Sequence, residues 1–308
     1  MKLKITFLIL VATGYTAVAQ QRPLQSLYMF DPLLVNPAYA GTQVQLSGTA
    51  IYRNQWLNLE GAPKTFTTTL HSGFRKYRVG LGLIASKDVI GIHDDTGLYG
   101  VYSYKIPLSK DNRRVISFGI QGGFNFITSD YNKLSLKNGS DPNLSGVDRR
   151  FNPNVGAGIY YRDGNFYGGF SVPYMLNNKL VSLNNVSSLA RQKRYYYLFA
   201  GYNAKLTENI TLVPSTLIRI QEQAPVSFDL NALVVLYQTV GLGVSYRLND
   251  AVVGLFELQI NNNFHVGYAY DFTTSKLNQF SNGSHELMVN YRIRLPKIHK
   301  GLECPAYW

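Results

Sequence analysis

The stretch Ile116–Phe126, which reads ISFGIQGGFNF, alternates between two kinds of side chain. One set is large and apolar: Ile116, Phe118, Ile120, Phe124 and Phe126. The set between them is small or polar: Ser117, Gly119, Gln121, Gly123 and Asn125. Because successive side chains of a strand point to opposite faces, this stretch predicts a β-strand with one apolar face and one small, polar face.

The same alternation recurs along the chain, most clearly in Val226–Leu236, Val252–Ile260, Phe264–Phe272 and Leu287–Leu295. After the first residues, no stretch resembles a transmembrane helix, which needs roughly 20 mostly apolar residues. A closed barrel leaves no backbone group unpaired in lipid, so we expect an all-β fold, a single transmembrane antiparallel β-barrel of about 14 strands. The expected strands cover residues 44–55, 65–74, 78–86, 96–107, 115–128, 154–161, 166–174, 195–205, 210–220, 225–236, 240–247, 251–260, 264–272 and 285–295.

The length of each gap between these strands depends on whether the gap is even- or odd-numbered along the chain. The even-numbered gaps are tight, whereas the three longest, around Ser129–Asn152, Leu176–Lys193 and Thr273–Ser284, are all odd-numbered. A barrel whose chain begins on the periplasmic side has short turns on that side and long loops outside. A soluble β-sandwich predicts no such sorting, and its strands are usually shorter, about 5–6 residues. The gaps therefore favour one membrane barrel with short periplasmic turns and long extracellular loops.

The first residues predict export through a cleaved signal peptide. Lys2 and Lys4 form a basic start, Ile5–Val11 is apolar, and Ala17-Val18-Ala19 is a small-x-small cleavage signal before Gln20. A membrane-anchoring helix is the alternative, but the apolar run is too short to span a bilayer. We therefore expect an integral outer-membrane protein. Its expected parts are a signal peptide (1–19), a periplasmic N-terminal cap (20–42), the barrel (43–295) and a periplasmic C-terminal tail (296–308).

The cap contains Pro32 and Pro37, which exclude a long regular helix, so we expect it over or inside the periplasmic mouth. The single cysteine, Cys304, can form no disulfide within the chain. The formal net charge is +12, from 30 Lys and Arg against 18 Asp and Glu, but the basic residues form no nucleic-acid-binding stripe. They indicate phosphate-bearing outer-membrane lipids or acidic protein partners, although a solvated surface explains the excess equally well.

The sequence predicts no catalytic, cofactor or metal site. The five histidines show no metal-ligand spacing. His285 follows Ser281 and Ser284, and His93 precedes Asp94 and Asp95, but proximity in sequence does not supply the geometry of a triad. The tyrosines at 160–161 and 195–197 lie at expected strand ends and favour an interfacial girdle.

Charged residues gather on the inner face of the last strands: Glu257, His265, Asp271, Arg292 and Arg294. Their mixed signs favour a plugged or partner-filled lumen over a free pore. Trp56 lies where the first strand meets the outer interface, a common position for an anchoring Trp. The candidate lumen or partner contacts are therefore Trp56, Glu257, Asp271, Arg292 and Arg294.

Three blocks of sequence go beyond a generic barrel: Val35–Gly41 (VNPAYAG), Tyr52–Pro63 (YRNQWLNLEGAP) and Tyr268–Arg294 (YAYDFTTSKLNQFSNGSHELMVNYRIR). Together with Cys304-Pro305 they resemble the PorP/SprF family of type IX secretion system outer-membrane proteins. The tail departs from the family pattern, because it reads CPAYW where a basic residue and a terminal Phe are expected. The blocks themselves are explained equally well by barrel closure and turn geometry as by contact with cargo.

The resemblance implies a non-enzymatic component, typical of gliding or secreting Bacteroidota, that supports secretion or surface anchoring of cargo proteins such as adhesins. It implies secreted cargo and periplasmic components of the same system as partners. Two other functions stay open: a passive porin for small solutes, and a barrel enzyme.

Overall fold

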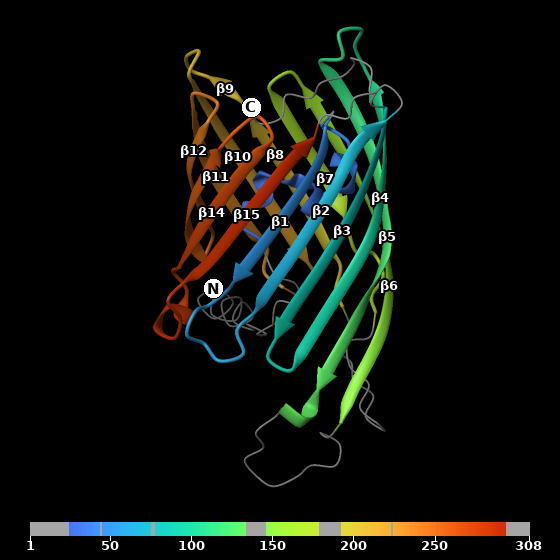
Figure 1. Ribbon diagram of the computed structural model, residues 1–308, viewed down its shortest axis with the longest axis vertical. Helices are drawn as coiled ribbons and strands as arrows, with labels where there is room; N and C mark the ends of the chain where they lie inside the picture. Colours follow the sequence, from blue (N-terminus) through green and yellow to red (C-terminus); the bar gives the residue numbers. More distant parts are fainter. Residues whose placement is uncertain are drawn as a thin grey trace, which may run out of the picture.

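The computed structural model describes residues 25–43, 45–74, 78–133, 146–178, 192–222 and 224–293. Within them the fold is almost entirely antiparallel β-structure (Figure 1). The strand segments are β1 (Leu46–Asn54), β2 (Lys64–Phe74), β3 (Val79–Ile90), β4 (His93–Pro107), β5 (Arg114–Asp130), β6 (Val147–Asp163), β7 (Phe166–Val172), β8 (Tyr195–Tyr202), β9 (Ala204–Lys205), β10 (Ile210–Gln221), β11 (Ser227–Leu236), β12 (Val240–Arg247), β13 (Ala251–Gln259), β14 (Phe264–Thr273) and β15 (Ser284–Ile293).

The sheet closes on itself. Each strand pairs with its neighbour in sequence, β1 pairs with β15, and β10 pairs with β11, which completes the ring. The segments β8 and β9 both pair with β10 and are interrupted only at Asn203, so they form one strand. The predicted barrel of 14 antiparallel strands is therefore confirmed.

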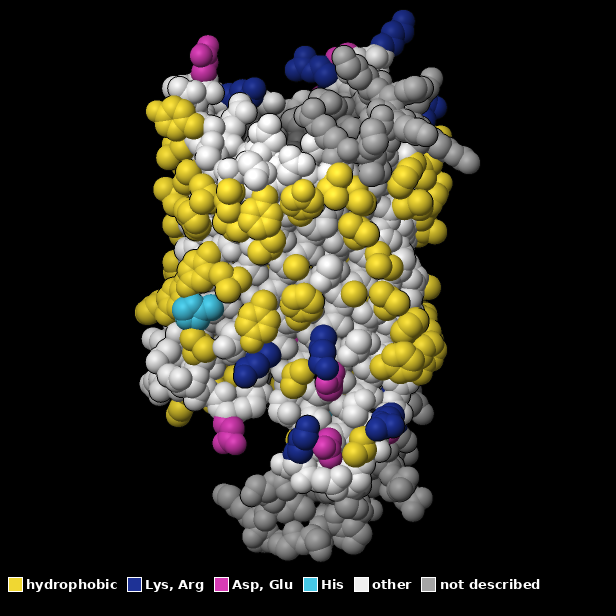
Figure 2. Space-filling view, viewed as in Figure 1, with side chains coloured by type: hydrophobic (Ala, Val, Ile, Leu, Met, Phe, Trp, Pro, Cys, Tyr) yellow, Lys and Arg dark blue, Asp and Glu magenta, His cyan; other side chains and the backbone are white. Residues whose placement is uncertain are grey.

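The two faces of β5 lie as the alternation predicts. Phe118 and Ile120 are 44% and 60% exposed on the outer wall, whereas Gln121 and Asn125 are buried inside. Figure 2 shows apolar side chains forming a band across the middle of one face of the molecule, with charged side chains above and below it. Such a band between polar ends is the outer surface that a bilayer requires. Among the described residues, no helix is long and apolar enough to cross a membrane.

The ends of the barrel differ as the gap lengths predict. The connections after β2, β4, β6, β9, β11 and β13 are short and lie at one end, the short-turn end. The other end, the long-loop end, carries the connections after β5, β7 and β14. Several strands are longer than expected, above all β6, which begins at Val147 instead of 154. Asp148, Arg149 and Arg150 read as loop residues in sequence, but they pair with β5 in a hairpin that projects beyond the barrel (Figure 1).

Residues 25–43 lie inside the barrel and are called the plug below. Figure 1 shows them as a blue segment enclosed by the strands. The plug has three short 3-10 turns, η2 (Leu27–Met29), η3 (Pro32–Leu34) and η4 (Pro37–Tyr39). The last two begin alike: Asp31 and Asn36 accept bonds from the amides of Leu33 and Ala38, and a Pro occupies the first position of each turn. Two further turns, η5 (Tyr131–Lys133) and η7 (Lys276–Gln279), lie in loops at the long-loop end.

The expected signal peptide, Arg294, Cys304 and the C-terminal tail lie outside the described residues.

Candidate functional site: a plugged lumen and its outer rim

The VNPAYAG block lies against inward-facing glycines of the barrel wall. A Cβ atom added to Gly119 would lie 2.2 Å from the backbone nitrogen of Ala38, and one added to Gly80 would lie 2.1 Å from the carbonyl oxygen of Ala40. Ser103 Oγ donates to that same oxygen over 2.7 Å. Real Cβ atoms do not come so close to backbone, so these wall positions let the two backbones touch. The block is therefore seated on the wall at the short-turn end.

The middle of the plug is fixed by single hydrogen bonds to several strands. Asn36 Nδ2 donates to the carbonyl of Ile159 over 2.9 Å, and Asn231 Nδ2 of β11 donates to the hydroxyl of Tyr28 over 2.8 Å. Asp31 accepts from the hydroxyl of Thr69. Because buried polar groups stabilise only when they are paired, these bonds specify one position of the plug in the lumen.

An ionic cluster holds the plug near the long-loop end. Arg53 of β1 bridges Asp271 of β14 and Glu286 of β15, with N···O distances of 2.6 and 2.8 Å. Ser26 completes the cluster: its Oγ donates to Asp271 over 2.8 Å, and its backbone amide donates to Glu286 over 2.8 Å. The amide of Leu27 reaches the other oxygen of Glu286 at 3.0 Å. Wall and plug thus share one set of buried charges.

Arg247 of β12 extends the cluster. Its guanidinium lies 3.3 Å from Asp229 and 3.4 Å from Asp271, and it donates to Ser26 Oγ over 3.3 Å. Two buried arginines therefore face three buried carboxylates. Buried charges are tolerated only when they are paired and their remaining hydrogen-bonding groups are satisfied. The plug amides supply donors that Glu286 would otherwise lack.

The predicted inner residues separate into two groups. Asp271 belongs to the cluster at the long-loop end. Glu257 and Arg292 are buried near the short-turn end, where Glu257 lies 3.6 Å from Nδ1 of His265. Arg292 donates to Asn290 over 2.9 Å and interacts electrostatically with Glu257 and with Asp31 of the plug. Arg294 is outside the described residues.

Arg53, Glu286, Arg247 and Asp229 were not among the predicted contacts. Their alternation along the strands places them inward, but only pairing across distant strands reveals the cluster, because Arg53 and Glu286 are 233 positions apart. The girdle prediction is wrong for Tyr160, Tyr195 and Tyr197, which are buried in the interior. Tyr195 and Tyr197 stack at a centroid distance of 6.3 Å, because alternate positions of one strand share a face.

Trp56 lies on the outer rim and not in the lumen. It belongs to the loop 55–63, which is bonded on both sides: the Leu57 amide donates to Gly283 over 2.9 Å, and the Gly91 amide donates to Gly61 over 2.9 Å. Trp56 itself has φ +49°, and its amide donates to Ser284 Oγ over 3.1 Å. A bulky residue adopts this left-handed backbone only where its surroundings impose it, and such strain gathers at functional sites.

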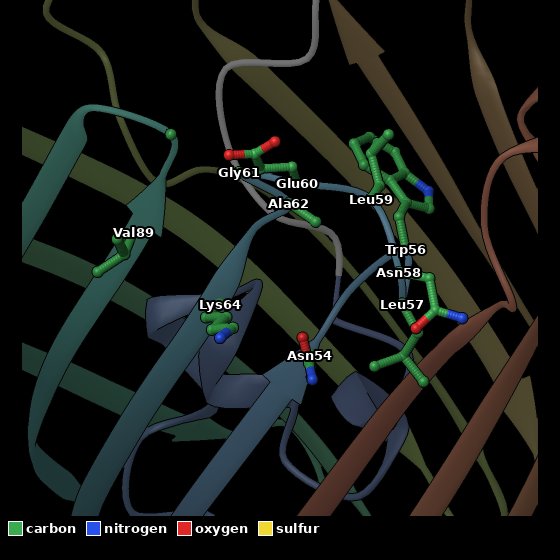
Figure 3. Close-up of a pocket in the computed structure, with 11 residues that line it drawn as sticks. Asn54, Trp56, Leu57, Asn58, Leu59, Glu60, Gly61, Ala62, Lys64 and Val89 are labelled. Atoms are coloured by element: carbon green, nitrogen blue, oxygen red, sulfur yellow. The ribbon is translucent and has the colours of Figure 1, made fainter. Parts of the chain in front are cut away.

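The loop 55–63 overhangs a recess of about 390 Å³ (Figure 3). Side chains of β1, β2 and β3 form the base of the recess, and the loop forms its upper edge. The lining residues are Asn54, Trp56, Leu57, Asn58, Leu59, Glu60, Gly61, Ala62, Lys64, Val89 and Gly91.

The two histidines considered for catalysis have other contacts. His285 Nδ1 lies 2.6 Å from the hydroxyl of Tyr268, and His93 Nδ1 lies 2.8 Å from Ser129 Oγ. In the described part of the chain, no three His, Cys, Asp or Glu side chains are grouped to hold a metal ion.

A closed barrel with an apolar outer band defines an integral outer-membrane protein, here with its lumen occupied by a segment of its own chain. The family model of type IX secretion system membrane protein PorP/SprF matches residues 17–291. The chain therefore belongs to the PorP/SprF family, as the three sequence blocks predicted.

Solved structures show the same fold at low sequence identity. The CymD monoaromatic hydrocarbon channel is 11% identical, with a TM-score of 0.54 over 92% of this chain and 96% of that one. The Ralstonia pickettii toluene transporter TbuX is 8% identical, with a TM-score of 0.54 over 86% of this chain and 93% of that one. No curated protein matches the chain.

Proposed function

We propose that this chain is a non-enzymatic component of the type IX secretion system that supports secretion or surface anchoring of cargo proteins, such as gliding adhesins, and does not conduct small solutes. Family membership supports the secretion role. The observation that carries the non-channel role is the plug, whose side chains and backbone are bonded to the wall at both ends of the lumen.

The three sequence blocks support this reading through their positions. Two of them, YRNQWLNLEGAP and the segment around GSHE, meet at the rim. There the Asn282 amide donates to the Leu57 carbonyl over 3.0 Å, and the Leu57 amide donates to the Gly283 carbonyl over 2.9 Å. The same blocks provide Arg53, Asp271 and Glu286, which hold the plug. We infer that the plug stiffens the long-loop end into a fixed platform, and that cargo contacts this platform with Trp56 among the contact residues.

The opposite end suits the periplasmic partners. Its turns are short, and they carry exposed basic residues such as Arg78, Arg113 and Arg114. Periplasmic components of the secretion system would approach this end, and a protein surface of opposite charge would be steered to it.

A small-solute channel is the alternative function. The two similar barrels are named as a hydrocarbon channel and a toluene transporter, but a likeness at about 10% identity concerns the fold. The plug opposes this alternative, because a conducting lumen would need a path around residues 25–43.

Two measurements on the same strains test the proposal. A deletion strain should lose surface display of particular type IX cargo, measured by surface proteolysis and by antibody labelling of whole cells, while the uptake of small solutes stays unchanged. The purified wild-type barrel should give no steady conductance in planar bilayers. Normal cargo display together with lost solute uptake would reject the proposal and establish the channel.

A further inference from the structure

We propose that the recess under the loop 55–63 is a binding site for the phosphorylated headgroup of an outer-leaflet glycolipid. The recess faces the membrane side of the wall and not the lumen. Asn54, Lys64 and Val89 share the outward parity of their strands and are neighbours across the sheet, Asn54 opposite Lys64 and Lys64 opposite Val89. Inward neighbours such as Arg53 and Thr65 are buried, whereas Lys64 is exposed.

The height of the recess matches the headgroup layer. Two positions nearer the bilayer on the same strands are Tyr52 and Phe66, which are 44% and 48% exposed on the outer wall. In the same register row, β3 and β4 contribute Lys87 and Thr96, and Phe126 and Phe151 follow on β5 and β6 at 51% and 57% exposure. Aromatic girdles mark the boundary between the hydrocarbon core and the headgroups. A recess just beyond the girdle at the long-loop end therefore lies among outer-leaflet headgroups.

The chemistry of the recess suits a phosphate on a sugar. Lys64 forms no ion pair with any described residue, so its ammonium is available to an anion. A lysine ammonium binds phosphate as a point charge, and the amides of Asn54 and Asn58 can bond to sugar hydroxyls or phosphate oxygens. Trp56 provides an apolar edge. Glu60 is the one carboxylate of the lining, and Figure 3 shows it at the far edge of the recess, on the opposite side from Lys64 and Asn54.

A neighbouring cation would strengthen binding, since Lys87 faces outward on β3 opposite Phe66. Lys87 already pairs with Asp94 at 3.1 Å, so we assign the direct contact to Lys64. The loop is held on both sides by backbone bonds, so the site exists before the lipid arrives, which lowers the entropic cost of binding.

The test uses the full-length barrel, purified in detergent, with diphosphoryl lipid A as the probe. Native mass spectrometry should detect one retained lipid A per wild-type barrel. The Lys64→Gln variant should bind about tenfold more weakly, because it loses a charge-assisted hydrogen bond. Lys205→Gln is the matched control, since Lys205 is also exposed but lies in β9 at the short-turn end, and its affinity should equal that of the wild type.

Three further arms decide the source of the anion and the role of the loop. Dephosphorylated lipid A should bind at least about tenfold more weakly than the diphosphoryl form. Inorganic phosphate at the same concentration should fail to compete, and Trp56→Ala should weaken binding without changing the heat-modifiable migration of the folded barrel. Equal affinities for Lys64→Gln and Lys205→Gln, equal binding of both lipid forms, or full competition by free phosphate would overturn the proposal.

Discussion

Arg53 joins three segments that are far apart in the chain: β1, which carries it, the β14–β15 hairpin, and the plug. It is 1% exposed, and its guanidinium donates to Asp271, Glu286 and Ser26 Oγ. A charge in this position cannot be hydrated, so its partners decide whether it stabilises or disrupts the barrel. The position of one side chain therefore couples the closure of the sheet to the position of the plug.

Replacing Arg53 by Met should lower the free energy of unfolding by about 3–5 kcal/mol, because two buried carboxylates would lose their closest cation. Urea titration of the barrel refolded in lipid vesicles measures the change. Lys87→Met is the matched control: Lys87 also forms an ion pair, but at 56% side-chain exposure. Its loss should cost about 0–1 kcal/mol. Similar costs for both variants would contradict the buried cluster.

Gly119 tests the contact between the wall and the plug. A side chain at this position must displace the backbone of Ala38, so Gly119→Val should push the plug from its seat at a cost of about 1–3 kcal/mol. The wild-type barrel should be silent in planar bilayers, and the variant should conduct. Gly122→Val is the control on the same strand, because a Cβ atom at Gly122 meets nothing within 4 Å. A silent Gly119→Val barrel, or equal conductance of the two variants, would argue against the plug as the barrier.

Among the structural elements, local sequence predicts the strands, but it does not predict how the plug fills the lumen. Alternation fixes which side of β5 faces lipid, since each side chain reports its own face. The lengths of the gaps similarly identify the two ends. The plug is different: its DP and NP turns are local, but Gly119, Ile159 and Glu286, which contact it, lie on strands far from it in sequence.

The wrong girdle prediction shows what alternation alone leaves open. Tyr195 and Tyr197 lie at a strand end, where lipid-facing tyrosines are common, and their parity alone does not say which face is the lumen. Asp271 and Glu257 share one inner face, as expected from their parity, and their places along the strands put them at opposite ends of the lumen. The lumen side of a strand can be read from sequence where one face is polar, but residues 195–199 (YYYLF) are apolar on both faces. Partners inside the lumen depend in addition on how the ring closes.

The lipid-facing side of β11 gives a prediction for the elements. Leu230 is 49% exposed on the outer wall. Leu230→Arg should impair membrane assembly, because an Arg at the bilayer midplane costs about 2–4 kcal/mol in such barrels. Glu208→Arg, in the turn between β9 and β10, carries the same new side chain outside the apolar band and should assemble normally. The fraction of heat-modifiable, membrane-inserted protein compares them, and equal insertion would mean that the outer face is wrongly assigned.

For the whole molecule, the sorting of turns and loops predicts the orientation in the outer membrane. Epitope tags inserted near Gly139 or Ser182 should be labelled by antibody on intact cells, because these positions lie in the connections after β5 and β7. Tags near Asn112 or Asp163, at the short-turn end, should be labelled only after the outer membrane is permeabilised. The reverse pattern would place the recess and Trp56 in the periplasm, and would remove the basis for both an outer-leaflet ligand and a cargo platform.

The plug runs from the short-turn end to the long-loop end, so the force needed to extract it depends on which end is pulled. Gly41 and Ala40 leave the lumen at the short-turn end and lead into β1, whereas Ser26 lies in the ionic cluster at the other end. A pull on residues 40–43 from the periplasm would break the contacts between plug and wall one after another and reach the ion pairs last. A pull on Gln25 from outside would load the ion pairs first and all together. Single-molecule force spectroscopy should therefore find a lower rupture force from the periplasmic side, and equal forces from both sides would contradict this consequence.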